Sequence, residues 1–185
     1  MKLNLGCGQN KQAGFVNVDK YDTFAPDILA DLEILPWPFE DNSADEIRMS
    51  HVLEHLGATT GVFLGIIREL YRVLKPQAPL HIRVPHPRSE HFIGDPTHVR
   101  PISPAVLALF SQKHNRESQA NGWSDTTLGL YLGVDFEVRS VNWVLARRWA
   151  QRYSAGEISK EQLEEAMETY NNVVDEIEMV LVKVA

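Results

Sequence analysis

Short runs of β-forming residues recur along the chain and are separated by turn-forming or helix-forming segments. Each run is rich in aliphatic or aromatic side chains, which is typical of strands buried in a sheet. The predicted strands lie at residues 3–5, 15–19, 28–31, 45–49, 79–84, 136–145 and 176–184. Strands that alternate with connecting segments in this way predict an α/β fold with a mostly parallel sheet of seven strands.

Two segments carry the apolar period of an α-helix. Between residues 63 and 74 the apolar side chains recur at i, i+3, i+4, i+7 and i+11, which places them on one helix face. Thr59 or Thr60 can cap the start of this helix, and Pro76 follows its end. The second helix is predicted over residues 161–170, where apolar side chains again share one face.

A long insertion separates the fifth and sixth predicted strands, from residue 85 to about residue 133. It contains five prolines and four histidines, which predict short helices and loops, with residues 107–110 as the most helical part. Because the insertion starts at the carboxyl end of a parallel strand, we expect it to cover a substrate bound there. The whole chain, residues 1–185, is then one domain that carries this insertion.

The first two connections between strands are unusually short. A crossover between parallel strands normally needs about a dozen residues, often a helix, whereas residues 6–14 and 20–27 provide fewer. We therefore expect the N-terminal crossover helices to be reduced to single turns or lost. One face of the sheet is then thinly covered, and a second copy of the chain, in a homodimer, is a candidate to cover it.

Composition narrows the class of protein. The chain has 44% hydrophobic and 23% charged residues and a net charge of −7, which suits a folded protein and disfavours nucleic acid as a partner. Its densest basic cluster is the pair Arg147 and Arg148. The single cysteine, Cys7, cannot form an intramolecular disulfide, and the N-terminus shows neither a signal peptide nor a membrane span. We expect a cytoplasmic protein with no membrane partner.

Three predicted strands end on residues that suit an adenosine ligand. Gly6 and Gly8 follow the first strand and permit a tight turn with close approach of the backbone to a ligand. Asp19 ends the second strand, where a carboxylate can accept hydrogen bonds from a ribose diol, and Asp31 ends the third. A dinucleotide fingerprint would need a glycine where Lys11 stands, which favours a cofactor without a pyrophosphate.

Several longer stretches resemble class I S-adenosylmethionine-dependent methyltransferases. These stretches are LNLGCG at residues 3–8, DLEILPWPFEDNS at 31–43, SHVLEHL at 50–56 and ELYRVLKP at 69–76. The resemblance covers roughly residues 3–87 and is closest to the compact type 11 methyltransferases. It implies a Rossmann-like methyltransferase sheet, S-adenosylmethionine as cofactor and transfer of its methyl group to an acceptor.

The resemblance also implies a role for each residue of the cofactor site. Gly6 and Gly8, with Cys7 between them, would line the methionine part of the cofactor; Asp19 would hold the ribose; Asp31 with Leu32 would hold the adenine, which Tyr21 or Leu32 could flank; and Ser50 with His51 would lie beside the sulfonium. Asn10 and Lys11 are candidates for the cofactor's carboxylate, because the segment after Gly8 is shortened. We read Cys7 itself as a small packing residue and not as a nucleophile.

The histidines supply candidates for a catalytic base. His51 lies near the expected methyl group, and His86 and His98 lie in the loop beyond the fifth strand, together with His91 and Asp95. His51 and His55 are four residues apart and would share a face if they lay on a helix. Glu54 does not stand next to the first histidine, as a zinc-protease motif requires. We assign no metal site.

The sequence thus predicts a methyltransferase that acts on an unidentified acceptor, most readily a small molecule. Two alternatives stay open. One is a module that binds S-adenosylmethionine without catalysis. The other is a metal-dependent hydrolase that uses the histidines of residues 86–98.

Overall fold

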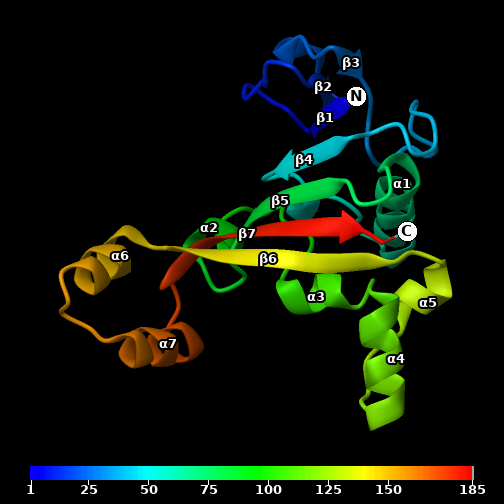
Figure 1. The fold of residues 1–185 in the computed structure, drawn as a ribbon. Helices are drawn as coiled ribbons and strands as arrows, with labels where there is room; N and C mark the ends of the chain where they lie inside the picture. Colours follow the sequence, from blue (N-terminus) through cyan, green and yellow to red (C-terminus); the bar gives the residue numbers. More distant parts are fainter. Residues whose placement is uncertain (185) are drawn as a thin grey trace.

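The structure, a computed structural model, describes residues 1–184. Seven strands form one sheet in the order β3-β2-β1-β4-β5-β7-β6 (Figure 1). The strands are β1 Lys2–Leu5, β2 Val16–Asp19, β3 Ile28–Leu29, β4 Glu46–Ser50, β5 Pro79–Pro85, β6 Phe136–Leu145 and β7 Val174–Lys183. Strands β1 to β5 pair in parallel, and β7 runs antiparallel to both β5 and β6. The predicted α/β fold with a mostly parallel sheet is confirmed.

The N-terminal connections lack the usual crossover helices. Residues 6–15 form turns, and the second connection contains only the short 3-10 helix η1, Asp22–Phe24. The third strand is shorter than predicted, so Asp31 lies two residues beyond its end at Leu29. The carboxyl ends of β1 and β2 are therefore flanked by loops, which leaves them open to a ligand.

Asn17 of β2 holds the first of these loops in place of a helix. Its side-chain oxygen accepts hydrogen bonds from the Gln12 amide (2.8 Å) and from Asn4 Nδ2 (2.9 Å). Its Nδ2 donates to Asp27 Oδ2 (2.8 Å), which also accepts the Asn17 amide. These two bonds hold the pKa of Asp27 below its usual range. The buried side-chain amide of Asn17 thus holds the two N-terminal loops in position, in a region where a crossover helix would normally pack.

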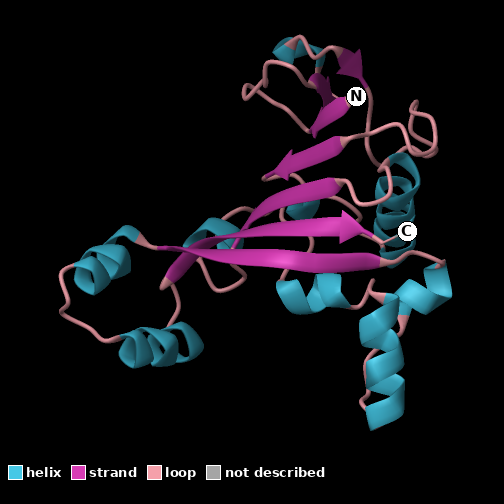
Figure 2. Ribbon diagram, in the orientation of Figure 1, coloured by secondary structure: helices cyan, strands magenta, loops and turns pink. Residues whose placement is uncertain are grey.

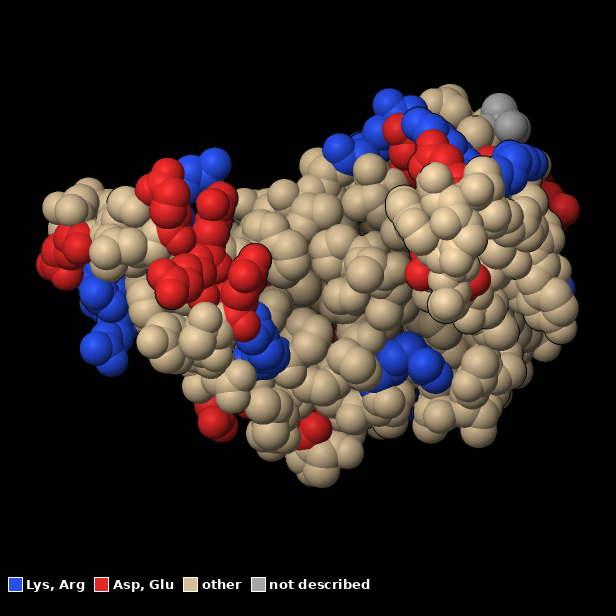
Figure 3. Space-filling view, turned by 90° about the horizontal axis from the view of Figure 1, so that it is seen from below, with Lys and Arg blue, Asp and Glu red and all other residues tan. Residues whose placement is uncertain are grey.

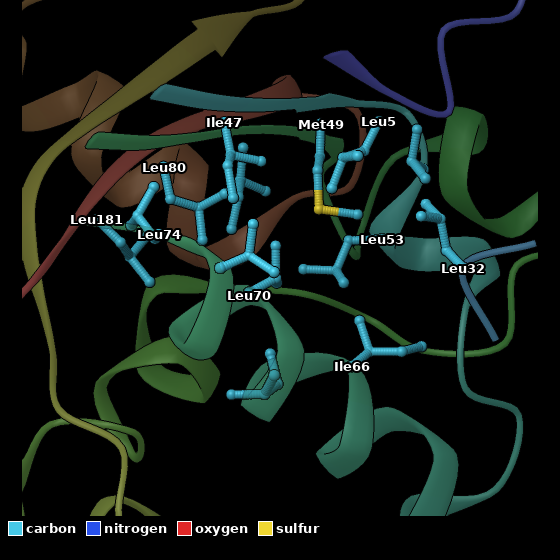
Figure 4. Close-up of a cluster of buried hydrophobic side chains, with 14 of the residues drawn as sticks. Leu5, Leu32, Ile47, Met49, Leu53, Ile66, Leu70, Leu74, Leu80 and Leu181 are labelled. Atoms are coloured by element: carbon cyan, nitrogen blue, oxygen red, sulfur yellow. The ribbon is translucent and has the colours of Figure 1, made fainter. Parts of the chain in front are cut away.

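Helix α1, Thr60–Val73, covers one face of the central strands. Its apolar side meets the buried residues of β1, β4, β5 and β7, and Figure 4 shows Ile66 and Leu70 pointing toward Ile47 and Met49. Lys183 of β7 ends the helix by donating to the carbonyl oxygens of Tyr71 (2.8 Å) and Leu74 (2.9 Å). The helix predicted between residues 63 and 74 is confirmed, with Thr59 at its N-cap.

The insertion and the β6–β7 connection carry the remaining helices (Figure 2). They are α2 Glu90–Ile93, α3 Pro104–Ala108, α4 Gln112–Asn121, α5 Leu128–Leu132, α6 Arg147–Ser154 and α7 Lys160–Thr169. The prediction for residues 107–110 was wrong in its limits, because α3 ends at Ala108. Helix α7 was predicted and α6 was not. Together α6 and α7 form an arm, residues 146–173, with its own apolar cluster of Ile158, Leu163, Ala166 and Val173.

The opposite face of the sheet is polar. Arg48, His81, Arg83 and Glu178 lie on its strands around a shallow depression, and none of them is fully buried. Arg83 pairs with Glu176 and lies 3.6 Å from Glu178, so the charges on this face are partly matched within the chain. The sheet face that crossover helices would cover is therefore exposed to solvent in the single chain.

Within the described part of the chain, no helix has the length and apolarity to cross a membrane.

Candidate functional site

The turn after β1 brings the backbone close to the segment after β4. Gly6 has a φ of 66°, a left-handed conformation that favours glycine. A Cβ atom at Gly6 would stand 2.5 Å from Cγ2 of Val52, so no larger residue fits without displacing that side chain. The glycine therefore lets the β1 turn and the β4 segment form adjoining walls of one cavity.

Asp19 ends β2 and faces the same turn. Its carboxylate accepts the Gly8 amide through Oδ2 (2.8 Å) and the Tyr21 amide through Oδ1 (3.0 Å). The residue is only 7% exposed, yet it lines the cavity. An ionised carboxylate offers about four acceptor positions, so each oxygen keeps capacity for a further donor such as a ribose hydroxyl.

A cavity of about 420 Å³ joins these elements. Its wall includes Gly6, Asp19, Lys20, Tyr21, Phe24, Ala30, Asp31, Leu32, His51, Val52, His55, Leu56 and Thr97. Tyr21 and Phe24 meet edge to face, with ring centroids 6.2 Å apart. Asp31 lies past β3 and uses Oδ1 to accept the Glu33 amide (2.9 Å). The volume and the mixed lining suit a small organic ligand with one polar and one aromatic end.

The structure brings six of the predicted cofactor residues to this cavity: Gly6, Asp19, Tyr21, Asp31, Leu32 and His51. Gly8 reaches the site through its bond to Asp19. Cys7 is buried behind the turn and its amide bonds Val18, while burial raises the pKa of its thiol. Ser50 lines the depression on the polar face of the sheet instead. The candidates Asn10 and Lys11 do not line the cavity either.

His51 lies where the first cavity meets a second one. Its backbone is left-handed, with a φ of 55°. Its Nε2 lies 2.9 Å from Glu176 Oε1, and its Nδ1 lies 3.4 Å from Glu54 Oε1. The hydrogen bond and charge of Glu54, with the charge of Glu176, raise the pKa of His51 against the opposing effect of burial. The imidazole therefore holds a proton more strongly than a free histidine does.

The second cavity measures about 410 Å³ and lies beyond the carboxyl ends of β4 and β5. It is lined by His51, His55, Pro85, His91, Asp95, His98, Val144, Asp175 and Glu176. Four histidines and three carboxylates in so small a space give it the capacity to hold protons, cations or hydroxyl groups. His51 and His55 line both cavities, so a ligand in one lies next to a ligand in the other.

The remaining candidate bases differ in position. His98 lines the second cavity and is nearly buried, with its ring stacked on Phe92. His86 lines neither cavity: its Nδ1 accepts the Arg88 amide (3.2 Å), and its ring packs on Trp143. Burial and the nearby Arg88 lower the pKa of His86. The contact with Trp143 therefore holds His86 away from both cavities.

Trp37 is a buried residue of the core.

Sequence reasoning missed one carboxylate of the site, Glu176, and gave another, Glu54, no role. Glu176 comes from β7, far along the chain, and bonds His51. Glu54 lies in the short 3-10 helix η2, Leu53–His55, and its side chain is 0% exposed. The segment is not an α-helix, so His51 and His55 do not share a helix face as their spacing suggests. The sequence signal for Glu54 is its position directly after the apolar residues Val52 and Leu53.

Part of the chain is similar to a known protein family. Residues 10–82 match a family model described as a methyltransferase domain. No curated protein sequence matches the chain.

Solved structures show the same fold at low identity. A SAM-dependent methyltransferase from Archaeoglobus fulgidus is 18% identical, with 98% of this chain and 85% of that one covered and a TM-score of 0.64. The 1,6-didemethyltoxoflavin-N1-methyltransferase of Burkholderia thailandensis is 11% identical, with 99% and 70% covered and a TM-score of 0.53. The [4+2]-cyclase SpnF is 15% identical, with 99% and 74% covered and a TM-score of 0.53.

The strand order, the glycine turn and Asp19 around one cavity define a class I methyltransferase fold. The matched segment, residues 10–82, is similar to the methyltransferase-domain family, and the solved structures share the fold over nearly the whole chain. The resemblance seen in the motifs is thereby confirmed. Likeness to SpnF shows that the fold alone does not define the reaction.

Proposed function

We propose that the chain binds S-adenosylmethionine in the cavity around Asp19 and transfers its methyl group to a small polar molecule in the second cavity. The observation that carries this proposal is the position of Asp19. Its carboxylate lies 2.8 Å from the Gly8 amide, on the wall that Gly6 also lines. A glycine turn and an acid from separate strands thus adjoin one space of the right size for an adenosine.

The cofactor's parts fit different regions of the cavity. Asp19 accepts the ribose hydroxyls, Tyr21 and Leu32 flank the adenine, and Asp31 accepts its amino group. The turn from Gly6 to Gly8 lies beside the methionine part. His51 lines both cavities, so a sulfonium bound beside it would lie next to the second cavity.

Methyl transfer needs alignment more than activation. The sulfonium already makes the methyl group electrophilic, so the protein chiefly has to hold the acceptor in line with it, and good alignment lowers a barrier by roughly 7–11 kcal/mol. An acceptor hydroxyl must also lose a proton. Of the three candidate bases, His51 and His98 line the second cavity and His86 does not, so the first two are better placed.

The second cavity favours a small acceptor over a macromolecule. It is a pocket of about 410 Å³ whose wall carries Asp95, Asp175 and Glu176. Carboxylates there repel phosphodiester backbones and attract hydroxyl groups or amines. Of the insertion, Pro85, His91, Asp95 and His98 line this wall, which supports a role for residues 85–98 in covering the acceptor.

A labelling experiment tests the proposed transfer. The purified chain is incubated with a whole-cell extract and S-adenosylmethionine that carries an isotopically labelled methyl group, and labelled small molecules, proteins and nucleic acids are identified separately by mass spectrometry. We expect labelled small molecules with the wild type and at least about tenfold less with Asp19→Asn, which loses one charge-assisted acceptor. Asp22→Asn, an exposed neighbour in η1, serves as the control and keeps wild-type labelling.

Each other result identifies a different function. Binding of the cofactor with no labelled product in any extract would indicate a non-catalytic binding module. Label found only on protein or nucleic acid would contradict the small-molecule acceptor. The metal-dependent hydrolase has no support from the fold or the matched family.

A further inference from the structure

Glu54 is a buried carboxylate that is only weakly paired. Its side chain is 0% exposed, and within residues 1–184 neither carboxylate oxygen makes a hydrogen bond of good geometry. The nearest charged group is the His51 ring, whose Nδ1 lies 3.4 Å from Oε1. A carboxylate in a protein interior is unfavourable unless a cation or hydrogen-bond donors accompany it. His51 approaches Oε1 only, so Oε2 has room for a second positive group.

Two histidines beside Glu54 each present a free ring nitrogen. His98 donates from Nδ1 to the Phe92 carbonyl (2.8 Å), which leaves a lone pair on Nε2. Thr97 uses its hydroxyl proton on Asp95 Oδ1 (2.6 Å), so its oxygen accepts from Nδ1 of His55 (2.9 Å). His55 therefore also keeps its lone pair on Nε2. Bonds of this kind orient metal-binding histidines and fix their tautomers.

The three groups converge from two separate segments. Glu54, His55 and His98 bring one ligand atom each to within 4.8 Å of one another. The His55 and His98 rings lie at a centroid distance of 4.5 Å, and Phe92 stacks on the outer side of His98. Asp95 Oδ2 lies 3.8 Å from the same His98 nitrogen, Nε2, so a second carboxylate stands beside the three groups. Small side-chain rotations would bring the ligand atoms to the separation that bonds of about 2 Å require.

We propose that Glu54, His55 and His98 bind a divalent transition-metal ion such as Zn²⁺ or Mn²⁺. Two imidazoles and one carboxylate match the ligand preference of these ions, whereas Mg²⁺ and Ca²⁺ prefer oxygen alone. Three protein ligands leave coordination positions open. His55 and His98 line the second cavity, so the open positions face the space assigned to the acceptor.

This position gives the metal a function that rests on the proposed methyl transfer. An acceptor hydroxyl bound to the ion would be held near the methyl group and would ionise more readily, because a bound cation lowers the pKa of coordinated oxygen. His98 then acts as a ligand, and the carboxylates of Asp175 and Glu176 on the same cavity wall are acceptors for the released proton. Chelating acceptors, with two neighbouring oxygens, fit the open positions best.

Metal binding is measured directly on chain purified without a histidine tag and stripped with a chelator. Calorimetry with Zn²⁺, Mn²⁺ and Mg²⁺ is performed on the wild type, Glu54→Gln, His98→Ala and His91→Ala. We expect about one Zn²⁺ or Mn²⁺ per chain, at least about 100-fold weaker binding in Glu54→Gln and His98→Ala, and much weaker Mg²⁺ binding. His91→Ala removes an exposed histidine of the same cavity and keeps wild-type affinity.

Thermal unfolding of the stripped proteins separates loss of the site from loss of the fold. Stripped Glu54→Gln and His98→Ala should still unfold in one cooperative transition, and added metal should raise the Tm of the wild type and of His91→Ala but not of these two variants. A wild-type chain that binds no transition metal, or Glu54→Gln and His98→Ala variants that bind it as tightly as the wild type, would overturn the proposal. S-adenosylhomocysteine binding is measured on the same samples, so failure of the cofactor site is seen independently.

Discussion

At the scale of single residues, Asn17 and Asp19 lie two positions apart on β2 and have different hydrogen-bond partners. Asn17 is buried and bonds the loop that replaces a crossover helix, whereas Asp19, two residues later, binds the glycine turn at the cavity wall. Both side chains lie at β2, so the strand positions together the loop and the acid that we propose as the ribose acceptor. We expect substitutions of Asn17 to act on folding and substitutions of Asp19 to act on cofactor binding.

The pair Glu69–Arg72 makes stability depend on pH. Glu69 accepts from Arg72 (2.7 Å) and from the Trp37 amide (2.7 Å), which hold its pKa below the usual value against the effect of burial. A carboxyl whose folded pKa is lowered stabilises the protein above its unfolded pKa, and this stabilisation is lost as the pH falls through the folded pKa.

We expect Glu69→Gln to lower the free energy of unfolding by about 1–3 kcal/mol at pH 7. The difference from the wild type should shrink below about pH 4.3, where the unfolded carboxyl takes up its proton. Urea unfolding at several pH values measures this. Equal losses at pH 7 and pH 3 would show that the effect does not come from the ionised carboxyl.

At the scale of elements, the arm of residues 146–173 is the part of the fold most distinct from the sheet. Its apolar cluster is separate from the main core, and Arg88 ties it to the β5 edge by donating to the Glu168 carbonyl (2.6 Å). Asn172 adds a bond to the Glu90 amide (2.7 Å). Figure 3 shows acidic side chains gathered at the left of the molecule, where α7 carries Glu161, Glu164, Glu165 and Glu168.

The arm joins β6 and β7 beside the second cavity, because Val144 and Asp175, which flank it, line that cavity. Replacing residues 147–172 by a short turn should leave S-adenosylhomocysteine affinity within about threefold of the wild type, since Asp19 and Gly6 are untouched. Methyl transfer, measured with an identified acceptor, should fall at least about tenfold through loss of acceptor positioning. Wild-type transfer in the shortened chain would show that the arm plays no part.

The sequence predicted the strands and α1 well but missed α6, and the reasons are physical. The strands and α1 have clear apolar patterns, and the glycine turn with Asp19 follows from where strands end. Helix α6 carries few apolar residues, so periodicity does not reveal it. Glu54 and His98 are distant in the chain, and their convergence depends on the path of the insertion, which turn residues alone do not specify.

At the scale of the whole molecule, the sheet is covered by helices on one side and exposed on the other. The short N-terminal connections predicted this asymmetry correctly. The exposed face carries Arg48, Arg83 and Glu178, unlike the apolar surface of an obligate interface. The homodimer stays a prediction, to be decided by the mass of the chain in solution.

The central claim is that one adenosine binds between the turn at Gly6 and the carboxylate of Asp19. Calorimetric titration of the folded chain with S-adenosylhomocysteine tests it most directly, with Asp19→Asn and the control Asp22→Asn beside the wild type. The account predicts one site per chain, an affinity about 10- to 100-fold weaker in Asp19→Asn, and no change in the control. A folded wild-type chain that shows no binding at high micromolar concentration, or an Asp19→Asn variant that binds as tightly, would contradict it.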